Sequence, residues 1–353
     1  MILLIHNGYN TFVKKDYEML NKNFKTKIFF YNPKRNLVNN LVNQTKLFFW
    51  LFLKICRTKI IYIWFADYHA FLPVLFAKIF KKKSIIIVGG YDAVSIPELK
   101  FGVFYNKNKK IRILFTKFSY RNADYILPVD KTLVQGINYY VSKNGLLIGV
   151  KQFVKNLKGK FKIVPTGYNP DIWYRKKDIR REKIVLSIGG VPDIRTFKRK
   201  GFDFLIEIAL KMPEVKFAII GLSYNILKYA QKLASNNVRL VGFAPNNQLI
   251  NFYSQAKVFC QLSLSEGLPN TLCEAMLCEC IPVGSDVNGI PTAINDCGFI
   301  LKEKNVDKAV ELIKKAVNSD ESLGKKARQR IINNYSFEKR EKEITLLIKK
   351  LMN

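Results

Sequence analysis

The sequence has few of the residues on which several kinds of site depend. It contains two histidines, His6 and His69, and no Asp-x-Asp pair, which is the usual carboxylate pair for a metal-bound diphosphate. Of six cysteines, three crowd residues 273–280 without a zinc-type spacing. The apolar run at 47–53 is far shorter than the roughly 20 residues that a membrane-crossing helix needs. We therefore expect no metal, no cofactor and no membrane-spanning helix.

Acidic residues are also scarce. The chain has 59 Lys and Arg against 27 Asp and Glu, a net charge of +32, and the first 170 residues hold 29 basic residues and 7 acidic ones. Such a field favours a polyanionic partner, either nucleic acid, an acidic glycan or an anionic lipid surface. No aromatic and glycine-rich RNA signature and no basic zipper is present. We therefore expect an anionic membrane surface and no nucleic acid, although biased residue usage would also raise the charge.

Two N-terminal stretches combine cations with bulky apolar residues. They lie at 46–59 and 106–121. Each predicts an amphipathic basic helix that lies on a bilayer surface. The alternative is a basic helix that packs on its own sheet and keeps its lysines in water.

Short apolar runs alternate with helical segments along the whole chain. The 353 residues exceed what one core usually holds, and 48% of them are hydrophobic, so two α/β domains are expected. Six cysteines without a signal sequence suggest reduced thiols in a cytosolic protein. The predicted strands run at 1–5, 27–31, 60–64, 84–88, 125–129 and 162–164, and then at 184–188, 216–220, 238–241, 258–262 and 281–283.

The segment 266–274 reads EGLPNTLCE and sets two carboxylates eight residues apart across a predicted loop-to-helix junction. Pro269 suits a first helical turn, and Asn270 and Thr271 can cap one, so Glu266 is expected in the loop and Glu274 on the helix. Free N–H groups there attract phosphate, while the acids suit sugar or ribose hydroxyls. This combination favours a nucleotide sugar, although a solvated first turn would look the same.

The surrounding residues extend this pattern. The motif continues as EAMLCECIPVG at 274–284 and NGIP at 288–291. It resembles family 4 of the retaining glycosyltransferases, whose motif has the form EGxPxxxxEAM. The resemblance implies a GT-B fold, with two Rossmann-like domains whose parallel sheets face across a cleft. We place an acceptor-binding domain at 1–174, a nucleotide-sugar-binding domain at 175–335, and a helix at 336–353 that crosses back to the first domain.

The resemblance also implies roles for the donor site. Arg195 and Lys200 stand at the family's interval for binding the donor diphosphate, where fixed cations stabilise a leaving group without a metal. A solvated basic loop is the plainer alternative. The chain departs from the family pattern at Cys280, Asn288 and Thr292. The implied donor-binding residues are Arg195, Lys200, Phe243, Glu266, Gly267, Leu268, Pro269, Asn270, Thr271 and Glu274.

The N-terminal half resembles the family less closely. Its candidates for an acceptor or phosphate loop are Gly8, His69, Gly89 and Gly90, and Asp92 is the candidate for positioning the acceptor. A lone histidine is more often a hydrogen-bonded structural residue than a catalyst, and an Asp after Gly-Gly is often a turn residue. The catalytic residues that the resemblance implies are Glu266, Arg195 and Lys200, and we add Asp92 to this set as the residue that positions the acceptor.

The resemblance implies a retaining, metal-independent glycosyltransferase, and the high positive charge adds the expectation that it acts at the inner face of the cell membrane. It would move a sugar from a nucleotide-diphosphate sugar to a glycan or lipid-linked acceptor in cell-envelope polysaccharide, lipopolysaccharide or glycolipid synthesis. One alternative is a nucleotide-sugar epimerase or phosphorylase of the same fold. Another is a nonenzymatic binder of anionic membranes or nucleic acid.

Overall fold

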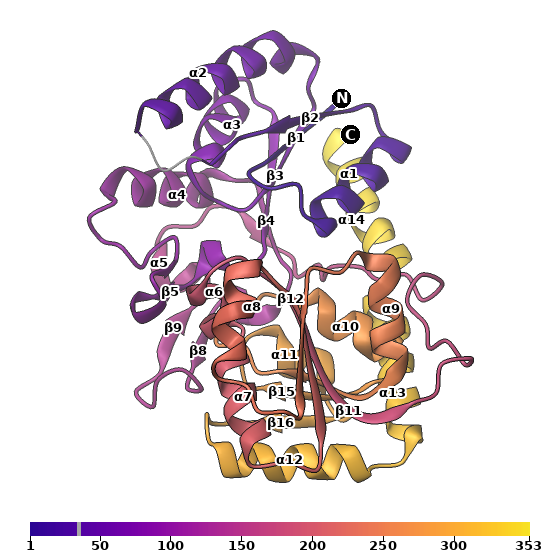
Figure 1. Cartoon of the computed structure of the whole chain (residues 1–353). Coiled ribbons are helices and arrows are strands. Elements are labelled where there is room, and N and C mark those ends of the chain that lie inside the picture. The colour runs from indigo at the N-terminus through magenta and orange to yellow at the C-terminus, as the bar shows by residue number, and fades with distance from the viewer. Residues whose placement is uncertain (34–36) are drawn as a thin grey trace. The chain divides into compact units, whose positions relative to one another are not determined.

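The computed structural model describes residues 1–33 and 37–353 and divides into two compact units. Their elements are labelled in Figure 1. The second unit is formed by Asn138–Leu146 and Tyr168–Phe337. The first unit is assembled from three pieces of the chain, which are Met1–Ile137, Leu147–Gly167 and Glu338–Asn353.

The first unit is built on a six-stranded parallel sheet in the order β10-β7-β4-β3-β1-β2. Every residue of β1 and β3 is buried, as expected for strands that are covered by helices on both faces. The strands are β1 (Ile2–His6), β2 (Thr26–Phe30), β3 (Ile60–Trp64), β4 (Lys83–Val88), β7 (Tyr125–Pro128) and β10 (Lys160–Phe161).

Helices α1 (Thr11–Asn23), α2 (Leu37–Lys54), α3 (Tyr68–Ile79), α4 (Lys110–Asn122), α5 (Val150–Phe153) and α14 (Phe337–Met352) complete this part of the chain, with the short strands β5 (Ser95–Ile96), β6 (Phe101–Gly102), β8 (Gly136–Asn138) and β9 (Leu146–Ile148). Both basic stretches predicted to be helical contain a helix, since α2 covers much of one and α4 most of the other. Within the described ranges, no helix combines the length and the apolar composition that a membrane crossing requires.

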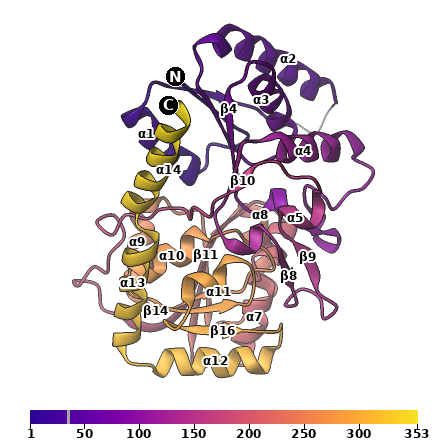
Figure 2. The same ribbon diagram turned by 180° about the vertical axis from the view of Figure 1, so that it is seen from behind.

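A buried ion pair fixes α14 to the first unit. Arg340 donates to both carboxylate oxygens of Asp16 on α1, at 2.8 and 2.7 Å, and the two side chains are 3% and 1% exposed. Its Nη1 also donates to the carbonyls of Val164 and Pro165. The hydroxyl of Tyr62 and the indole N–H of Trp64 supply further donors to Asp16. Figure 2 shows α14 beside α1, as the pairing requires.

The second unit repeats the design with a six-stranded parallel sheet in the order β13-β12-β11-β14-β15-β16. Its strands are β11 (Glu182–Val191), β12 (Lys216–Leu222), β13 (Val238–Gly242), β14 (Ala256–Gln261), β15 (Ile281–Ser285) and β16 (Phe299–Leu301). Its helices are α6 (Ile194–Arg199), α7 (Phe202–Leu210), α8 (Tyr224–Gln231), α9 (Asn246–Gln255), α10 (Asn270–Leu277), α11 (Gly289–Ile294), α12 (Val306–Asn318) and α13 (Glu321–Tyr335).

Two parallel α/β domains are therefore confirmed, and most predicted strands fall on observed ones. Two strands differ. The strand expected at 162–164 lies two residues earlier, where β10 covers only Lys160–Phe161. The strand β16 was not predicted. Both are edge strands of two or three residues, too short to leave a periodic signal. The main break between the units falls at Gly167 and Tyr168, and the prediction put it after residue 174.

Candidate functional site

The segment 266–274 lies at the carboxyl end of β14 in the second unit. Glu266 is in the loop after the strand, and Glu274 is on α10, as the pattern predicts. The predicted caps are wrong: Pro269 directly precedes the helix, and neither following side chain caps it. Instead Thr271 donates to the Gln261 side chain at 3.1 Å, and Asn270 accepts from Tyr168 at 3.0 Å. These side chains fix the helix start to its neighbours.

The carboxylate of Glu266 is the centre of a polar cluster. Lys200 Nζ lies 2.6 Å from Glu266 Oε1, and Arg199 Nη1 lies 3.8 Å from the same atom. Ser263 Oγ and Gln261 Nε2 donate to it at 3.0 and 3.4 Å. The side chains of Glu266, Lys200 and Arg199 are only 12 to 15% exposed. A partly buried carboxylate thus has two cations within reach.

Opposing effects act on the ionisation of Glu266. Burial would raise the pKa of this carboxyl, but the charges of Lys200 and Arg199 outweigh burial, so the pKa lies below its ordinary value. The group is therefore ionised at neutral pH. An ionised carboxylate beside two cations can accept hydrogen bonds from hydroxyls and leave the cations available to an anion.

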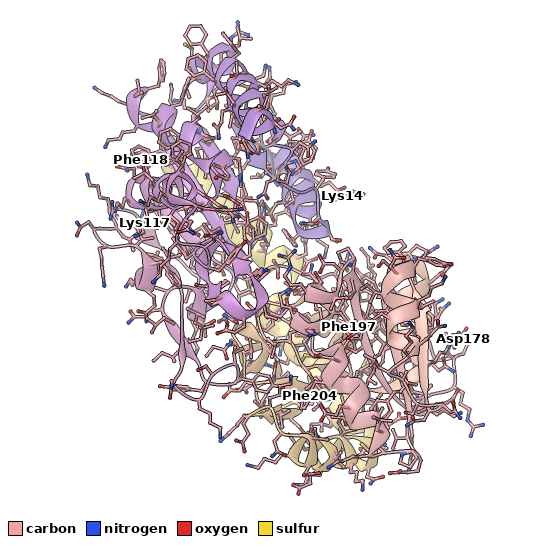
Figure 3. All side chains as sticks on the ribbon, turned by 60° about the vertical axis from the view of Figure 1, so that its left-hand side comes forward. Lys14, Lys117, Phe118, Asp178, Phe197 and Phe204 are labelled. Atoms are coloured by element: carbon pink, nitrogen blue, oxygen red, sulfur yellow. The ribbon has the colours of Figure 1, made fainter. Side chains whose placement is uncertain are left out.

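The end of α6 positions the cations. Asp193 caps this helix by accepting from Thr196 N at 2.7 Å, and Phe197 of α6 is fully buried and labelled in Figure 3. After the helix, Gly201 has a φ of 72°, and a Cβ there would lie 2.1 Å from the carbonyl oxygen of Leu262. Only glycine allows so close an approach of the chain to the end of β14. The capped helix α6 before Lys200 and the close approach at Gly201 after it thus fix the backbone on both sides of this lysine.

Arg195 lies near the start of α6, beside the acid that caps this helix. Its guanidinium lies 3.5 Å from Asp193 and its side chain is 41% exposed. Arg199, one helical turn later on the same face, lies beside Glu266 instead. Arg199 is therefore a site residue that the sequence analysis missed, and the diphosphate role of Arg195 stays a prediction.

Glu274 lies on α10, and Asn288 directly precedes α11. Glu274 is 6% exposed and accepts from the hydroxyl of Tyr253 at 3.3 Å. Asn288 is 6% exposed with a φ of 48°, and its side-chain oxygen accepts from Glu266 N at 3.5 Å. Its Nδ2 has no hydrogen-bond partner among the described residues. A buried donor without a partner is costly unless a ligand completes it.

The remaining donor-site candidates lie in the same unit. Gly267 accepts from Gly289 N at 2.9 Å, and Leu268 is 7% exposed. Phe243 directly follows β13 and is 83% exposed, so its ring is available for stacking. The roles of these residues stay predictions.

The N-terminal candidates are mostly structural in their contacts. Asp92 is fully buried and accepts from Ala66 N, Gly90 N and the hydroxyl of Tyr120, at 3.0, 3.1 and 2.7 Å. Burial raises the pKa of Asp92 to about 6. Asp92 would thus position an acceptor only through the backbone around it. A Cβ at Gly89 would meet the Phe65 ring at 2.2 Å, and Gly8 lies two residues after the end of β1.

His69 is 1% exposed, and its Nε2 donates to the carbonyl of Trp64 at 2.8 Å. Nearby, a network that the sequence analysis missed lies after β3. Asp67 accepts two hydrogen bonds from Arg112, at 2.7 and 2.6 Å, and a third from Tyr91 at 3.2 Å. The hydroxyl of Tyr91 accepts from Asn7 at 2.7 Å. Asp67 lies three residues after the buried strand β3, and that position was the available signal.

The buried imidazole of His6 predicts that the stability of the protein depends on pH. Burial lowers the pKa of His6 to about 4, from an ordinary value of 6.5. The unfolded chain therefore binds a proton first, and stability is lost as the pH falls from about 6.5 to about 4. We expect His6→Gln to remove roughly 2–3 kcal/mol of this loss, at 1.36 kcal/mol per pKa unit. Urea unfolding at pH 7 and pH 4.5 tests this, and an equal acid loss in both proteins would contradict it.

Across residues 1–33 and 37–353, no group of three or more His, Cys, Asp or Glu side chains is arranged to hold a metal ion.

Comparison with known families and sequences gives two matches of interest. Residues 173–336 match the family described as "Glycosyl transferases group 1". Among curated proteins, the GPI3 subunit of phosphatidylinositol N-acetylglucosaminyltransferase of Saccharomyces cerevisiae is 28% identical over 152 residues, which is 40% of this chain and 33% of that protein. The chain thus spans about a third of the length of this relative.

Solved structures match over the whole chain. Sucrose-phosphate synthase from Thermosynechococcus elongatus superposes with a TM-score of 0.76 at 15% identity, over 99% of this chain and 98% of that one. Alr3699/HepE from Anabaena, in complex with UDP-glucose, gives a TM-score of 0.69 at 12% identity, over 99% of each chain. At these identities the likeness shows the fold alone.

Proposed function

We propose that this chain, which has the GT-B fold and a segment that matches the group 1 glycosyl transferases, is a retaining and metal-independent glycosyltransferase of family 4. Its donor would be a nucleotide-diphosphate sugar. The observation that carries the proposal is the cluster at the end of β14, where a partly buried, ionised Glu266 meets Lys200 and Arg199.

Each member of the cluster has a role in this reaction. Lys200 and Arg199 neutralise the negative charge that develops on the departing nucleoside diphosphate, which is the work that a metal ion does elsewhere. Glu266 accepts hydrogen bonds from sugar hydroxyls, and the free Nδ2 of Asn288 donates to the sugar or to a phosphate oxygen. Glu274 accepts from the ribose hydroxyls.

Retention of configuration follows from same-face attack in this proposal. The acceptor hydroxyl attacks the anomeric carbon on the side from which the diphosphate leaves, and a departing phosphate oxygen takes the hydroxyl proton. The carbon–oxygen bond to phosphate breaks as the new glycosidic bond forms, so no protein nucleophile is needed.

Relatives suggest the classes of donor and acceptor. The Anabaena structure holds UDP-glucose, and the yeast relative carries N-acetylglucosamine and phosphatidylinositol in its name. We therefore infer a UDP-sugar as donor and a glycan or lipid-linked acceptor, in the synthesis of cell-envelope polysaccharide, lipopolysaccharide or glycolipid. An acceptor of this kind would place the enzyme at the cytoplasmic face of the membrane.

Nucleotide binding is the first test. In a thermal-shift panel of UDP, GDP and ADP, one nucleotide is expected to stabilise the protein by about 2.7 kcal/mol at a hundred times its Kd.

Glu274→Ala should weaken the binding of that nucleotide about 10- to 100-fold, because the substitution removes hydrogen bonds to a charged group that are worth roughly 1.5–3 kcal/mol. The matched control is Glu311→Ala, an exposed acid on α12. Equal affinity in both variants would remove Glu274 from the site.

Product analysis separates the proposal from its rivals. An epimerase changes the sugar when the donor is supplied alone, whereas the proposed enzyme needs an acceptor. The anomeric configuration of the product, read by NMR, must be that of the donor, and turnover in EDTA must match turnover with magnesium. No response to any nucleoside diphosphate, combined with salt-sensitive RNA binding, would favour the nonenzymatic alternative.

A further inference from the structure

Lysines gather at one edge of the sheet in the first unit. Because its strands are parallel, all of them begin at the same edge. Lys59 precedes β3, Lys83 begins β4 and Lys160 begins β10, and all three side chains are exposed. The candidate acceptor residues follow the strands at the opposite, carboxyl edge. The lysine edge is therefore not a part of the site described above.

An open pocket of about 600 Å³ lies at this edge. Its lining includes Lys78 at the end of α3, Lys81–Lys83, Lys158, Lys160 and Lys350 on α14. Asp124 is the one carboxylate among the lining residues, and it lies 3.5 Å from Lys83. The positive charge of the pocket is thus largely uncompensated, which favours an anionic ligand.

The lysines at this edge also change the pKa of the amino-terminal group. Burial lowers the pKa of the Met1 amino group, and the nearby charges of Lys59, Lys25 and Lys82 lower it further. Lysines from separate segments therefore act on one region of the surface.

An apolar surface adjoins the pocket. Helix α2 buries Leu47 and Leu51 and exposes Phe48, Phe49, Phe52 and Leu53, whose exposed fractions are 41, 58, 60 and 76%. The helix is thus packed on one side and apolar on the other, which is unusual for a surface in water.

Ring contacts join this surface to the pocket. Phe48 packs edge-on against Phe76 at 5.3 Å, and Phe76 stacks on Phe80 at 5.7 Å. Phe80 and Ile79 are 38 and 61% exposed, and they lie between Lys78 and Lys81 in the sequence. Figures 1 and 2 both show α2 and the C-terminal end of α14 at the same end of the first unit.

We propose that this surface docks on an anionic lipid bilayer. We call it the basic-aromatic face, defined by Phe48, Phe49, Phe52, Leu53, Ile79 and Phe80 together with the pocket lysines named above. The lysines would bind lipid phosphates, and the aromatic and aliphatic side chains would enter the boundary between headgroups and acyl chains. A nucleic acid would use the lysines but would leave Leu53 and Ile79 in water.

This inference deepens the proposed placement at a membrane and rests on it for its biological sense. It assigns the contact to the strand-starting edge of the first unit, so the carboxyl edge with its candidate acceptor residues stays uncovered. Lipid binding is measured without sugar transfer, so its failure would leave the proposed chemistry standing.

Co-sedimentation with vesicles tests the basic part of the face. The whole chain is expected to bind vesicles of phosphatidylglycerol and phosphatidylcholine, and not vesicles of phosphatidylcholine alone. A triple variant, Lys81→Glu, Lys158→Glu and Lys160→Glu, should weaken binding by about a hundredfold or more, given the contribution of each lysine near an anionic surface. The charge-matched control carries Lys232→Glu, Lys314→Glu and Lys325→Glu, all exposed on the second unit. Equal weakening in both would overturn the proposal.

The chain's own tryptophan tests the apolar part. Trp50 lies on α2 and is partly exposed, whereas Trp64 and Trp173 are 1 and 4% exposed. Lipids brominated on the acyl chains should quench the fluorescence of the bound protein, and Trp50→Phe should abolish the quenching. Phe49→Ser with Phe52→Ser should reduce vesicle binding while nucleotide-induced stabilisation is unchanged. Absent quenching, or RNA binding that displaces the vesicles and ignores the phenylalanines, would overturn the proposal.

Discussion

Turnover of the nucleotide sugar is expected to fall by a factor of about a hundred or more when Lys200 is replaced by alanine. The lysine Nζ lies 2.6 Å from Glu266 and its side chain is 14% exposed, so its charge is poorly screened by water. A charge that stabilises the departing diphosphate acts mainly in the transition state. The loss should therefore appear in kcat, with a smaller change in KM. Release of nucleoside diphosphate measures both constants.

A matched control separates this effect from a general loss of charge. Lys198 is two residues earlier and exposed, so Lys198→Ala should retain nearly full turnover. Because Lys200→Ala also removes a partner of Glu266, the double variant with Glu266→Gln is compared with Glu266→Gln alone, and an unchanged kcat between these two would mean that the lysine acts only through the acid. Near-normal kcat in Lys200→Ala would contradict the role assigned to this lysine.

The largest expected effect on stability belongs to Arg340. Arg340→Ala leaves the carboxylate of Asp16 buried without its cation, and such a loss destabilises a protein by about 3–5 kcal/mol. The indole of Trp64 donates to this carboxylate at 2.9 Å, so its fluorescence reports on the same region. Urea unfolding in a background with Trp50→Phe and Trp173→Phe would isolate that signal.

Two further variants make the result specific. Lys342 is exposed on the same helix, and Lys342→Ala should change stability by less than about 0.5 kcal/mol. Adding Asp16→Asn to Arg340→Ala removes the stranded charge and should recover part of the loss. A cost below about 1 kcal/mol for Arg340→Ala would mean that the pair is not essential to the unit.

The fold was largely predictable because parallel strands covered on both faces appear as continuous apolar runs. Residues 60–64 and 184–188 are such runs, and both lie in strands. The short edge strands β10 and β16 carry too few residues for such a pattern. The return of the C-terminal helix to the first unit was expected from the family resemblance, and the Arg340 and Asp16 contact that holds it joins residues 324 positions apart. The assignment of 138–146 to the second unit depends on tertiary contacts that no sequence pattern indicates.

The candidate site was predictable only where local geometry sets it. Glu266 and Glu274 follow from a loop-to-helix junction that the sequence marks clearly. Arg195 was chosen by family spacing, yet α6 brings Arg199 beside Glu266, and spacing along a chain does not tell how far a short helix extends. Asn288 stands out in the sequence as a departure from the family pattern. That its Nδ2 is buried without a hydrogen-bond partner among the described residues could be seen only in the structure.

Residues far apart in the sequence account for the rest. The Asp67 and Arg112 pair joins residues separated by 45 positions, and the sequence marks only one of them, Asp67, by its place shortly after a buried strand. Likewise, the basic stretches predicted helices correctly. The lysines of the pocket, however, come from α3, from the first residues of β4 and β10, and from α14 and connecting loops. The sequence showed that charge was abundant, and the parallel sheet determined where it accumulates.

The distance between Asp16 and Arg340 also bears on biosynthesis. Domains generally fold in the order in which the ribosome releases them. Here the half that emerges first keeps a stranded acid until a guanidinium from 324 positions downstream has been translated. The first unit would therefore stay incompletely folded while the second unit is translated and folds. During that time holdase chaperones could bind it.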